Sequence, residues 1–262
     1  MKKKISNWSN NLNFDAKVFK PKNYSEIKKI LENNNKFIAR GSGFNYGDST
    51  FSNNVINLEK LKKKIKINIK KKVIECTSNV TLNEILDFCE KRRLTLAVLP
   101  GTGKITLGGA IASDVHGKNH IIAGSFCNYL EEITIICSNG KILKCSEKKY
   151  KDLFRSTCAG MGLTGIILKA KLRLVKLKSN TMEIKNFFFQ DYKKLVNFIS
   201  TKNTIYSITW IDFYSIKRTN LRAIFSEGNF LNKNEIIKKN NFKIPHIISR
   251  IYFNKVLIKF FN

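Results

Sequence analysis

Glycine falls at positions 101, 103, 108, 109 and 117 of the stretch PGTGKITLGGAIASDVHGKNH, which covers residues 100–120. This density is unfavourable inside a helix or strand, because glycine loses backbone entropy there and adds no packing. The stretch therefore indicates a backbone against which another group lies closely. A nucleotide phosphate, a flat cofactor ring and a tightly crossing strand are the candidates.

Two further glycine-rich stretches accompany it, RGSGFNYG at 40–47 and AGMGLTG at 159–165. Backbone N–H groups that converge on one concavity bind phosphate oxygens, and each charge-assisted bond contributes roughly 1.5–3 kcal/mol. Neither common nucleotide motif fits. GTGKIT has no Ser or Thr directly after its lysine, and GSGFNYG has Tyr46 where G-x-G-x-x-G requires glycine. The sequence thus disfavours a P-loop and a Rossmann site.

The elements that position these loops can be read from local patterns. Asn23 with Glu26 predicts a helix over 24–33, and Thr81 with Glu84 forms a capping box for a helix whose buried stripe contains Ile85. The strand KFIAR leads directly into the first glycine loop, and Asn139-Gly140 predicts a hairpin within 132–145. In 166–177, apolar and basic residues alternate, which is typical of a long strand with one buried face.

The chain carries 48 Lys and Arg against 19 Asp and Glu, a net charge of +29. Such a field attracts polyanions. However, lysines alternate with Ile65, Ile67 and Ile69, as on the solvated face of a strand, and no RNP, zinc-finger or helix-turn-helix pattern is present. We expect no nucleic-acid partner, and a basic nucleic-acid-binding module stays the non-enzymatic alternative.

Six cysteines without a CxxC pair indicate a reducing compartment, and the basic start MKKKISNWSNN has no apolar run behind it. We therefore expect a cytoplasmic protein. His116 and His120 are four residues apart, but Gly117 lies between them and no acidic third ligand is near, so we expect no metal. The glycines around His116 leave two interpretations open, a structural hydrogen bond or a place beside a cofactor.

The segments IARGSGFNYGDS, LPGTGKITLGGAIASDVHGKNHIIAGSF and LFRSTCAGMGLTGIIL together resemble the FAD-binding domain of the vanillyl-alcohol-oxidase (PCMH-type) superfamily. Within it the chain most resembles the decaprenylphosphoryl-ribose 2-oxidase family. The resemblance implies an α+β fold: a PCMH-type FAD-binding domain of two α/β subdomains over 1–178, followed by the first part of an antiparallel-sheet cap, or substrate, domain over 179–262.

The resemblance also implies site residues. Tyr46 and Trp210 correspond to positions near the substrate, and His116 lies beside the flavin as a candidate catalytic residue. The cofactor-binding set comprises Arg40, Gly41, Ser42, Gly43, Phe44, Asn45, Tyr46, Pro100, Gly101, Thr102, Thr106, Gly108, Gly109, Ala110, Ser113, His116, Gly117, Gly160, Gly162, Thr164, Gly165 and Ile166. No histidine or cysteine lies in 40–49, where related enzymes often attach the flavin, so we expect FAD to be held non-covalently.

The implied reaction is hydride transfer from a secondary alcohol of a sugar or sugar-lipid to FAD, which gives a keto-sugar. A partner NAD(P)H-dependent reductase would complete an epimerisation. An aldonolactone oxidase of the same superfamily is the alternative. The sequence leaves the sugar, the lipid carrier and the electron acceptor open.

The end of the chain, IPHIISRIYFNKVLIKFFN, combines an apolar helical stripe with basic residues. It predicts either weak peripheral association with anionic membranes or a helix that packs on its own fold. Members of the resembled family are longer than this chain, and their substrate-site lysine and cysteine follow in the additional part. We therefore expect residues 1–262 not to turn over substrate alone.

Overall fold

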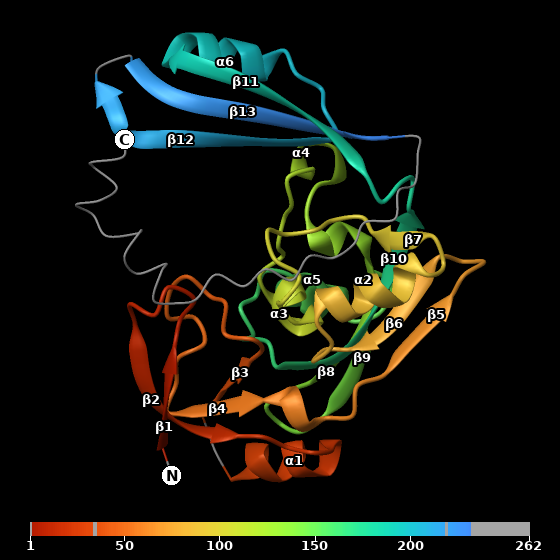
Figure 1. Cartoon of the computed structure of the whole chain (residues 1–262). Coiled ribbons are helices and arrows are strands. Elements are labelled where there is room, and N and C mark those ends of the chain that lie inside the picture. The colour runs from red at the N-terminus through yellow and green to blue at the C-terminus, as the bar shows by residue number, and fades with distance from the viewer. Residues whose placement is uncertain (1, 34–35, 218–219, 232–262) are drawn as a thin grey trace. The chain divides into compact units, whose positions relative to one another are not determined.

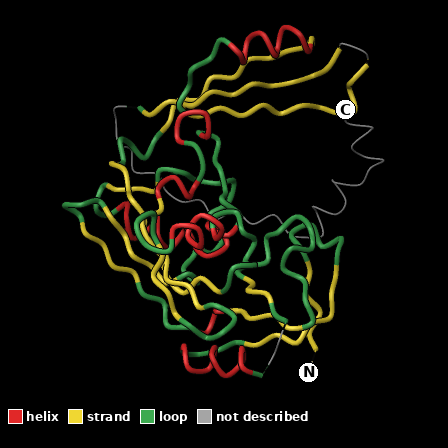
Figure 2. The backbone as a smooth tube through the Cα atoms, turned by 180° about the vertical axis from the view of Figure 1, so that it is seen from behind, coloured by secondary structure: helices red, strands yellow, loops and turns green. Residues whose placement is uncertain are grey.

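The computed structural model describes residues 2–33, 36–217 and 220–231. The chain divides into two compact units, Met1–Leu177 and Lys178–Asn262. Figure 1 labels the elements of both. The fold is α+β, as expected, with strands predominating over short helices. Figure 2 shows this balance along the backbone.

The first sheet of the first unit has the strand order β1-β2-β4-β3. Its strands are β1 (Lys2–Ser6), β2 (Asn13–Phe19), β3 (Ile38–Arg40) and β4 (Asn54–Asn57). β4 runs parallel to both β2 and β3, whereas β1 is antiparallel to β2. Because β3 ends at Arg40, it delivers the first glycine loop to the edge of this sheet.

Helix α1 (Tyr24–Glu32) covers this region and begins where the sequence predicted. The Asn23 side chain accepts from the Glu26 N–H at 2.9 Å, which satisfies one of the open donors of the first turn. Ile27 and Leu31 are buried together with apolar residues of β4, β8 and β10. This small core therefore joins the first sheet to the second.

The second sheet has the order β5-β6-β10-β8-β9, and β7 also pairs with β10. Its strands are β5 (Ile65–Asn68), β6 (Val73–Thr77), β7 (Leu94–Leu96), β8 (Leu130–Ile136), β9 (Ile142–Cys145) and β10 (Ile166–Lys176). β10 is antiparallel to all three of its neighbours. Its predicted alternation is confirmed, as is the hairpin, in which Gly140 takes a φ of 74°.

The extent of the first lysine-rich strand was predicted incorrectly. β5 ends at Asn68, and Ile69 lies in the following turn with 54% of its surface exposed. The Asn68 side chain accepts from the Lys71 N–H at 3.0 Å. This side-chain bond closes a local turn and ends the strand one residue before the alternating pattern does.

The helices of this unit are short, and the main apolar core packs around them. They are α2 (Leu82–Glu90), α3 (Leu107–Ala112), α4 (His120–Ala123) and α5 (Lys151–Thr157), with 3₁₀ helices η1 (Leu58–Lys60) and η2 (Phe126–Tyr129). The capping box of α2 is confirmed, because the Thr81 and Glu84 side chains each bond the other's backbone N–H. Leu82, Ile85 and Cys89 are fully buried in the core.

The polar face of the second sheet carries an alternating row of charges. Lys66, Glu75, Lys171 and Glu132 are register partners across β5, β6, β10 and β8. Glu75 accepts from the Lys169 ammonium group at 3.3 Å and forms an ion pair with Lys171 at 3.8 Å, and Lys171 also lies 3.2 Å from Glu132. Two carboxylates thus offset the cationic side chains of the central strand.

The second unit contains an antiparallel sheet of order β11-β13-β12. Its elements are β11 (Met182–Asp191), α6 (Tyr192–Ser200), β12 (Tyr206–Lys217) and β13 (Asn220–Phe230). Asp191 caps α6 by accepting from the Lys194 N–H at 2.8 Å. Leu195 of α6 packs with Leu221, Ala223 and Phe225 of β13.

The predicted amphipathic segment at 244–262 lies outside the described residues. Among the helices that the structure describes, none is long and apolar enough to cross a bilayer.

The cap of α1 provides a test of local stability. We expect Asn23→Ala to lower the free energy of unfolding by about 1 kcal/mol, because the Glu26 N–H loses its acceptor. Ser25 is exposed and lies in the same helical turn, so Ser25→Ala is the matched control, and Asn23→Ser retains a capping oxygen. Urea denaturation measures all three variants, and equal stability of Asn23→Ala and Ser25→Ala would contradict this assignment.

Candidate functional site

The first glycine loop, at 40–47, is fastened from two sides. The Trp8 N–H donates to the Asn45 carbonyl of the loop at 2.9 Å. The Trp8 and Phe44 rings also pack edge to face, with their centroids 4.4 Å apart. The Arg40 guanidinium donates to the Thr50 hydroxyl and to the Ser6 carbonyl. Burial lowers the pKa of Arg40 from its ordinary value. These contacts fix the loop before any ligand is considered.

Glycine is required at position 43 of this loop. Its φ is +77°, and a Cβ there would collide with the Arg40 guanidinium. In the described part of the chain, the backbone N–H groups of residues 41–45 have no intramolecular acceptor. The loop therefore offers a run of open hydrogen-bond donors.

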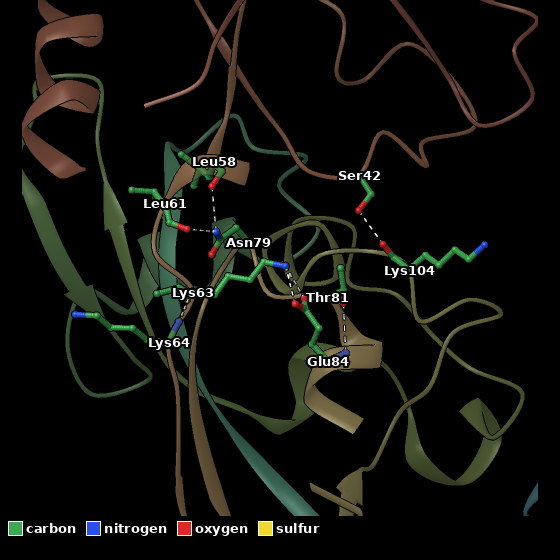
Figure 3. A network of polar contacts seen from close by, with 10 residues as sticks. Ser42, Leu58, Leu61, Lys63, Lys64, Asn79, Thr81, Glu84 and Lys104 are labelled. Carbon is green, nitrogen blue, oxygen red and sulfur yellow. Dashed lines mark hydrogen bonds and ion pairs between the residues drawn. The ribbon is translucent and has the colours of Figure 1, made fainter. Parts of the chain in front are cut away.

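The second glycine stretch meets the first at Thr106. The Thr106 side chain caps α3 by accepting from the Gly109 N–H at 3.3 Å, and its hydroxyl occupies the space that a Cβ on Gly41 would need. Ser42 donates to the Lys104 carbonyl at 2.8 Å (Figure 3). The two loops are thus in contact at two points.

The first N–H groups of α3 are already bonded within the protein. Leu107 N–H donates to the Val80 carbonyl at 2.8 Å, and Gly108 N–H donates to the Ser78 carbonyl at 2.9 Å. A Cβ on Gly108 would lie 3.0 Å from the Ser78 Cβ. Glycine at 108 therefore serves the close approach of two segments, and α3 is not a free anion-binding terminus.

The third glycine loop lies against the other end of α3. The Ala159 N–H donates to the Ile111 carbonyl at 3.2 Å, and the Met161 N–H donates to the Ala112 carbonyl at 2.8 Å. Gly165 has a φ of +140° and packs against the Ile136 carbonyl. α3, which belongs to the second glycine stretch, thus holds the third glycine loop through these backbone bonds.

The three loops line one cavity of about 370 Å³. A pocket of this size lies within the range that holds small molecules and cofactors. The predicted cofactor-binding residues that line it are Arg40, Gly41, Ser42, Gly43, Phe44, Asn45, Thr106, Gly108, Gly109, Ser113, Gly162, Gly165 and Ile166. Residues from three separate parts of the sequence thus converge on one space.

The other predicted residues do not line this cavity. They are Tyr46, Pro100, Gly101, Thr102, Ala110, His116, Gly117, Gly160 and Thr164. Ala110 is fully buried in the core, Gly117 packs against the Leu99 carbonyl, and the Thr164 hydroxyl lies 3.0 Å from that of Thr157. These last three residues have structural contacts of their own, and the cofactor roles of all nine stay predictions.

His116 is exposed, and its backbone forms an isolated bridge with Ser125. Its ring lies 5.4 Å from the ring of His120, edge to face. The described residues contain no group of three His, Cys, Asp or Glu side chains placed to hold a metal ion. A role for His116 beside the flavin stays a prediction.

The two predicted substrate residues lie in different units and are both exposed. Tyr46 is 83% exposed in the first unit, and its carbonyl accepts from the Asn7 side chain. Trp210 is 56% exposed on β12 of the second unit. Their roles toward a substrate stay predictions.

Sequence reasoning missed a polar group of cavity residues at the N-terminal end of α2. Asn79 is buried and donates to the Leu58 and Leu61 carbonyls at 3.1 and 2.8 Å, and Thr81 bonds Glu84 (Figure 3). Lys63, which also lines the cavity, lies 2.7 Å from the Glu84 carboxylate. The segment has no glycine pattern, so no sequence signal indicates that it reaches the cavity.

Two buried oxygens in this group have no hydrogen-bond partner among the described residues, Ser78 Oγ and Asn79 Oδ1. Both residues line the cavity. An unpaired buried polar atom costs about 1–3 kcal/mol, so each is expected to bond a ligand or ordered water. The wall of the cavity therefore contains polar residues with unused hydrogen-bonding capacity beside apolar residues.

A family model for the FAD binding domain matches residues 16–146, half of the chain. The chain belongs to this FAD binding domain family. The matched residues include the first two glycine loops, Ser78, Asn79 and α3, and the cofactor of the family is FAD.

The individual relatives are named as oxidases and dehydrogenases, which agrees with the family match. The chain is 31% identical over 208 residues to a decaprenylphosphoryl-beta-D-ribose oxidase of Mycolicibacterium smegmatis, which covers 77% of this chain and 45% of that protein. It is 25% identical over 178 residues to L-gulonolactone oxidase of Bos taurus, 66% of this chain and 40% of that protein. A D-lactate dehydrogenase of Archaeoglobus fulgidus is 26% identical over 169 residues. The chain spans less than half the length of these relatives in the matched regions.

The cavity fits FAD on three observations. The open N–H groups of residues 41–45 suit a diphosphate, and the unpaired oxygens of Ser78 and Asn79 suit donors such as ribityl hydroxyls. Around Gly109, a Cβ would meet only the Thr106 hydroxyl oxygen, at 3.2 Å, so space beside this glycine is available to a ligand.

Gly109 provides the sharpest test of this assignment. We expect Gly109→Val to weaken FAD binding at least about a hundredfold, about 2.8 kcal/mol, because the new side chain enters cavity space while the protein contacts around it remain. Fluorescence titration of the apoprotein with FAD measures the change.

The matched control is Gly47→Val. Gly47 does not line the cavity, and a Cβ there would meet no heavy atom within 4 Å. We expect its FAD affinity to stay within about twofold of the original. Equal loss of affinity in both variants would show that the cofactor lies elsewhere.

Proposed function

We propose that this chain is the flavin-binding part of an FAD-dependent oxidoreductase that oxidises a secondary alcohol of a sugar to a keto-sugar. The observation that carries the proposal is the cavity in which three glycine loops meet beside open backbone donors. When bound, FAD supplies a hydride acceptor for the carbinol carbon.

The residues of the chain contribute binding and orientation. The loop at 41–45 offers N–H donors to the diphosphate, and Ser78 and Asn79, which also line the cavity, offer buried acceptors. The close contacts of Thr106 with Gly41 and of α3 with the third loop hold these groups in fixed positions. Pre-formed contacts of this kind reduce the ordering cost of binding.

The substrate that we favour is a ribose-type sugar carried on a polyprenyl phosphate. The support is the 31% identity to a relative named for decaprenylphosphoryl-beta-D-ribose. Under this proposal the keto-sugar passes to an NAD(P)H-dependent reductase that completes an epimerisation, and the pair acts in cell-envelope synthesis on the cytoplasmic side. Weak contact with an anionic membrane would bring the enzyme to a lipid-linked substrate.

A second candidate is oxidation of an aldonolactone. L-gulonolactone oxidases of two mammals and a catshark match the chain at 23–25% identity over 177–178 residues. The lower identity favours the sugar-lipid substrate, and a direct comparison of substrates distinguishes the two.

We expect FAD to be held without a covalent bond. The residues that line the cavity include no histidine or cysteine in the part of the chain that the structure describes. Acid precipitation of the yellow protein should therefore release all the flavin into the supernatant. Flavin absorbance that remains with the washed pellet would disprove this expectation.

The substrate class is tested by anaerobic reduction of the bound flavin. The protein reconstituted with FAD is mixed with a polyprenyl-phosphoryl pentofuranose, L-gulono-1,4-lactone or D-lactate, and the loss of the yellow flavin absorbance is followed. Because residues 1–262 are expected not to turn over substrate alone, we expect every rate to stay below roughly 1 per second, and we compare the residual rates. The sugar-lipid should reduce the flavin at least about tenfold faster than either alternative, a difference of about 1.4 kcal/mol in activation free energy. Faster bleaching by the lactone would contradict the sugar-lipid substrate and support oxidation of an aldonolactone.

A further inference from the structure

Lys63 places a cation in the wall of the cofactor cavity. Within the described part of the chain, the charged residues that line this cavity are Arg40, Glu59 and Lys63. The Arg40 guanidinium donates to the Thr50 hydroxyl and the Ser6 carbonyl, so it already fastens the first glycine loop. Glu59 is an acid, which repels an anionic ligand. Lys63 is therefore the cation of this wall that the structure of the loop does not require.

Lys63 is held in place by the carboxylate of Glu84. Its ammonium group donates to the two carboxylate oxygens at 2.7 and 2.8 Å, and the two side chains are 42% and 41% exposed. Ion pairs with this exposure contribute little to stability, because water screens the charges. Glu84 also accepts from the N–H and the hydroxyl of Thr81, each at 2.8 Å. The ammonium group can thus leave Glu84 at small cost, because the carboxylate keeps two donors.

A short series of contacts links this ion pair to the first glycine loop. Thr81, which bonds Glu84, forms an isolated antiparallel bridge with Thr106. The Thr106 hydroxyl in turn lies where a Cβ on Gly41 would stand. Figure 3 shows the Lys63 side chain extended toward Thr81 and Glu84 at the start of α2. The part of the wall that carries Lys63 is therefore joined, through two threonines, to the loop whose open N–H groups suit a diphosphate.

We propose that Lys63 is a phosphate-binding residue of the FAD site and that it exchanges the Glu84 carboxylate for the FAD diphosphate when the cofactor binds. This inference rests on the proposed function, because it requires FAD in the cavity. Phosphate oxygens accept strong hydrogen bonds from ammonium groups, and these add to the bonds from backbone N–H groups. A bond between an ammonium group and a phosphate in a partly enclosed cavity is also less screened than an exposed ion pair.

The test is fluorescence titration of the apoprotein with FAD. We expect Lys63→Gln to weaken FAD binding about tenfold, about 1.4 kcal/mol, and Lys63→Arg, which keeps a cation, to lose less. Riboflavin has the same ring system and no phosphate, so its affinity should stay within about twofold in Lys63→Gln. A tenfold loss for riboflavin as well would overturn the assignment of Lys63 to the diphosphate.

Lys64→Gln is the matched control, because it removes the same charge from the next residue. Lys64 is exposed, does not line the cavity, and points away from Glu84 in Figure 3. Its FAD affinity should stay within about twofold of the original. Urea denaturation verifies that each variant is folded.

Glu84→Gln tests the exchange itself. Glutamine retains an oxygen for the Thr81 N–H but holds Lys63 less strongly, so FAD should bind about threefold more tightly. Glu90→Gln removes the same charge from an exposed residue at the other end of α2, outside the cavity lining, and should bind FAD as the original chain does.

The outcomes separate this inference from the proposed function. Equal FAD affinity of Lys63→Gln and Lys64→Gln would overturn the role of Lys63 and leave FAD binding in place. Equal affinity of Glu84→Gln and Glu90→Gln would overturn the exchange. An original chain that binds no FAD would contradict the proposed function itself.

Discussion

The cavity depends on the backbone bonds at the two ends of one short helix. α3 donates from its first turn to the carbonyls of Val80 and Ser78, and it accepts at its other end from Ala159 and Met161. Two segments that lie far from α3 in the sequence are thereby drawn to opposite ends of a six-residue helix. The close approach of α3 to Ser78 requires glycine at 108, because the Ser78 Cβ occupies the space that a side chain on residue 108 would need.

This arrangement assigns different tasks to glycines that look equivalent in the sequence. Gly43 and Gly165 adopt backbone conformations that favour glycine, Gly108 permits a close contact, and Gly109 leaves space open. Mutation to a larger residue would damage the fold at the first three positions and the ligand space at the fourth. The glycines of the three stretches thus meet several different physical requirements.

Much of the fold could be predicted from the sequence, because its signals are local. The caps of α1 and α2, the Asn139-Gly140 hairpin and the alternation of β10 all arise from residues a few positions apart. The end of β5 was misjudged because a side-chain bond of Asn68 outweighed the alternating pattern. Local patterns could not anticipate that competition.

The site was less predictable, because its members meet only in the folded chain. Resemblance identified the glycine loops that converge on the cavity, whereas Ser78 and Asn79 carry no motif and became visible only as buried oxygens without partners. Conversely, Ala110 belongs to a conspicuous stretch but points into the core. Membership of a motif identifies a segment, and the direction of each side chain depends on tertiary packing.

The row of charges on the second sheet has a consequence for how this protein tolerates sequence change. Lysine is abundant in the chain, with 48 Lys and Arg against 19 Asp and Glu, so the loss of one surface cation alters little. Glu75 is different, because among the acidic residues that the structure describes it alone forms ion pairs with both Lys169 and Lys171 on the central strand. Lysine in place of Glu75 on β6 would therefore put a third cation beside Lys169 and Lys171 of β10, and like charges that face each other across neighbouring strands are destabilising.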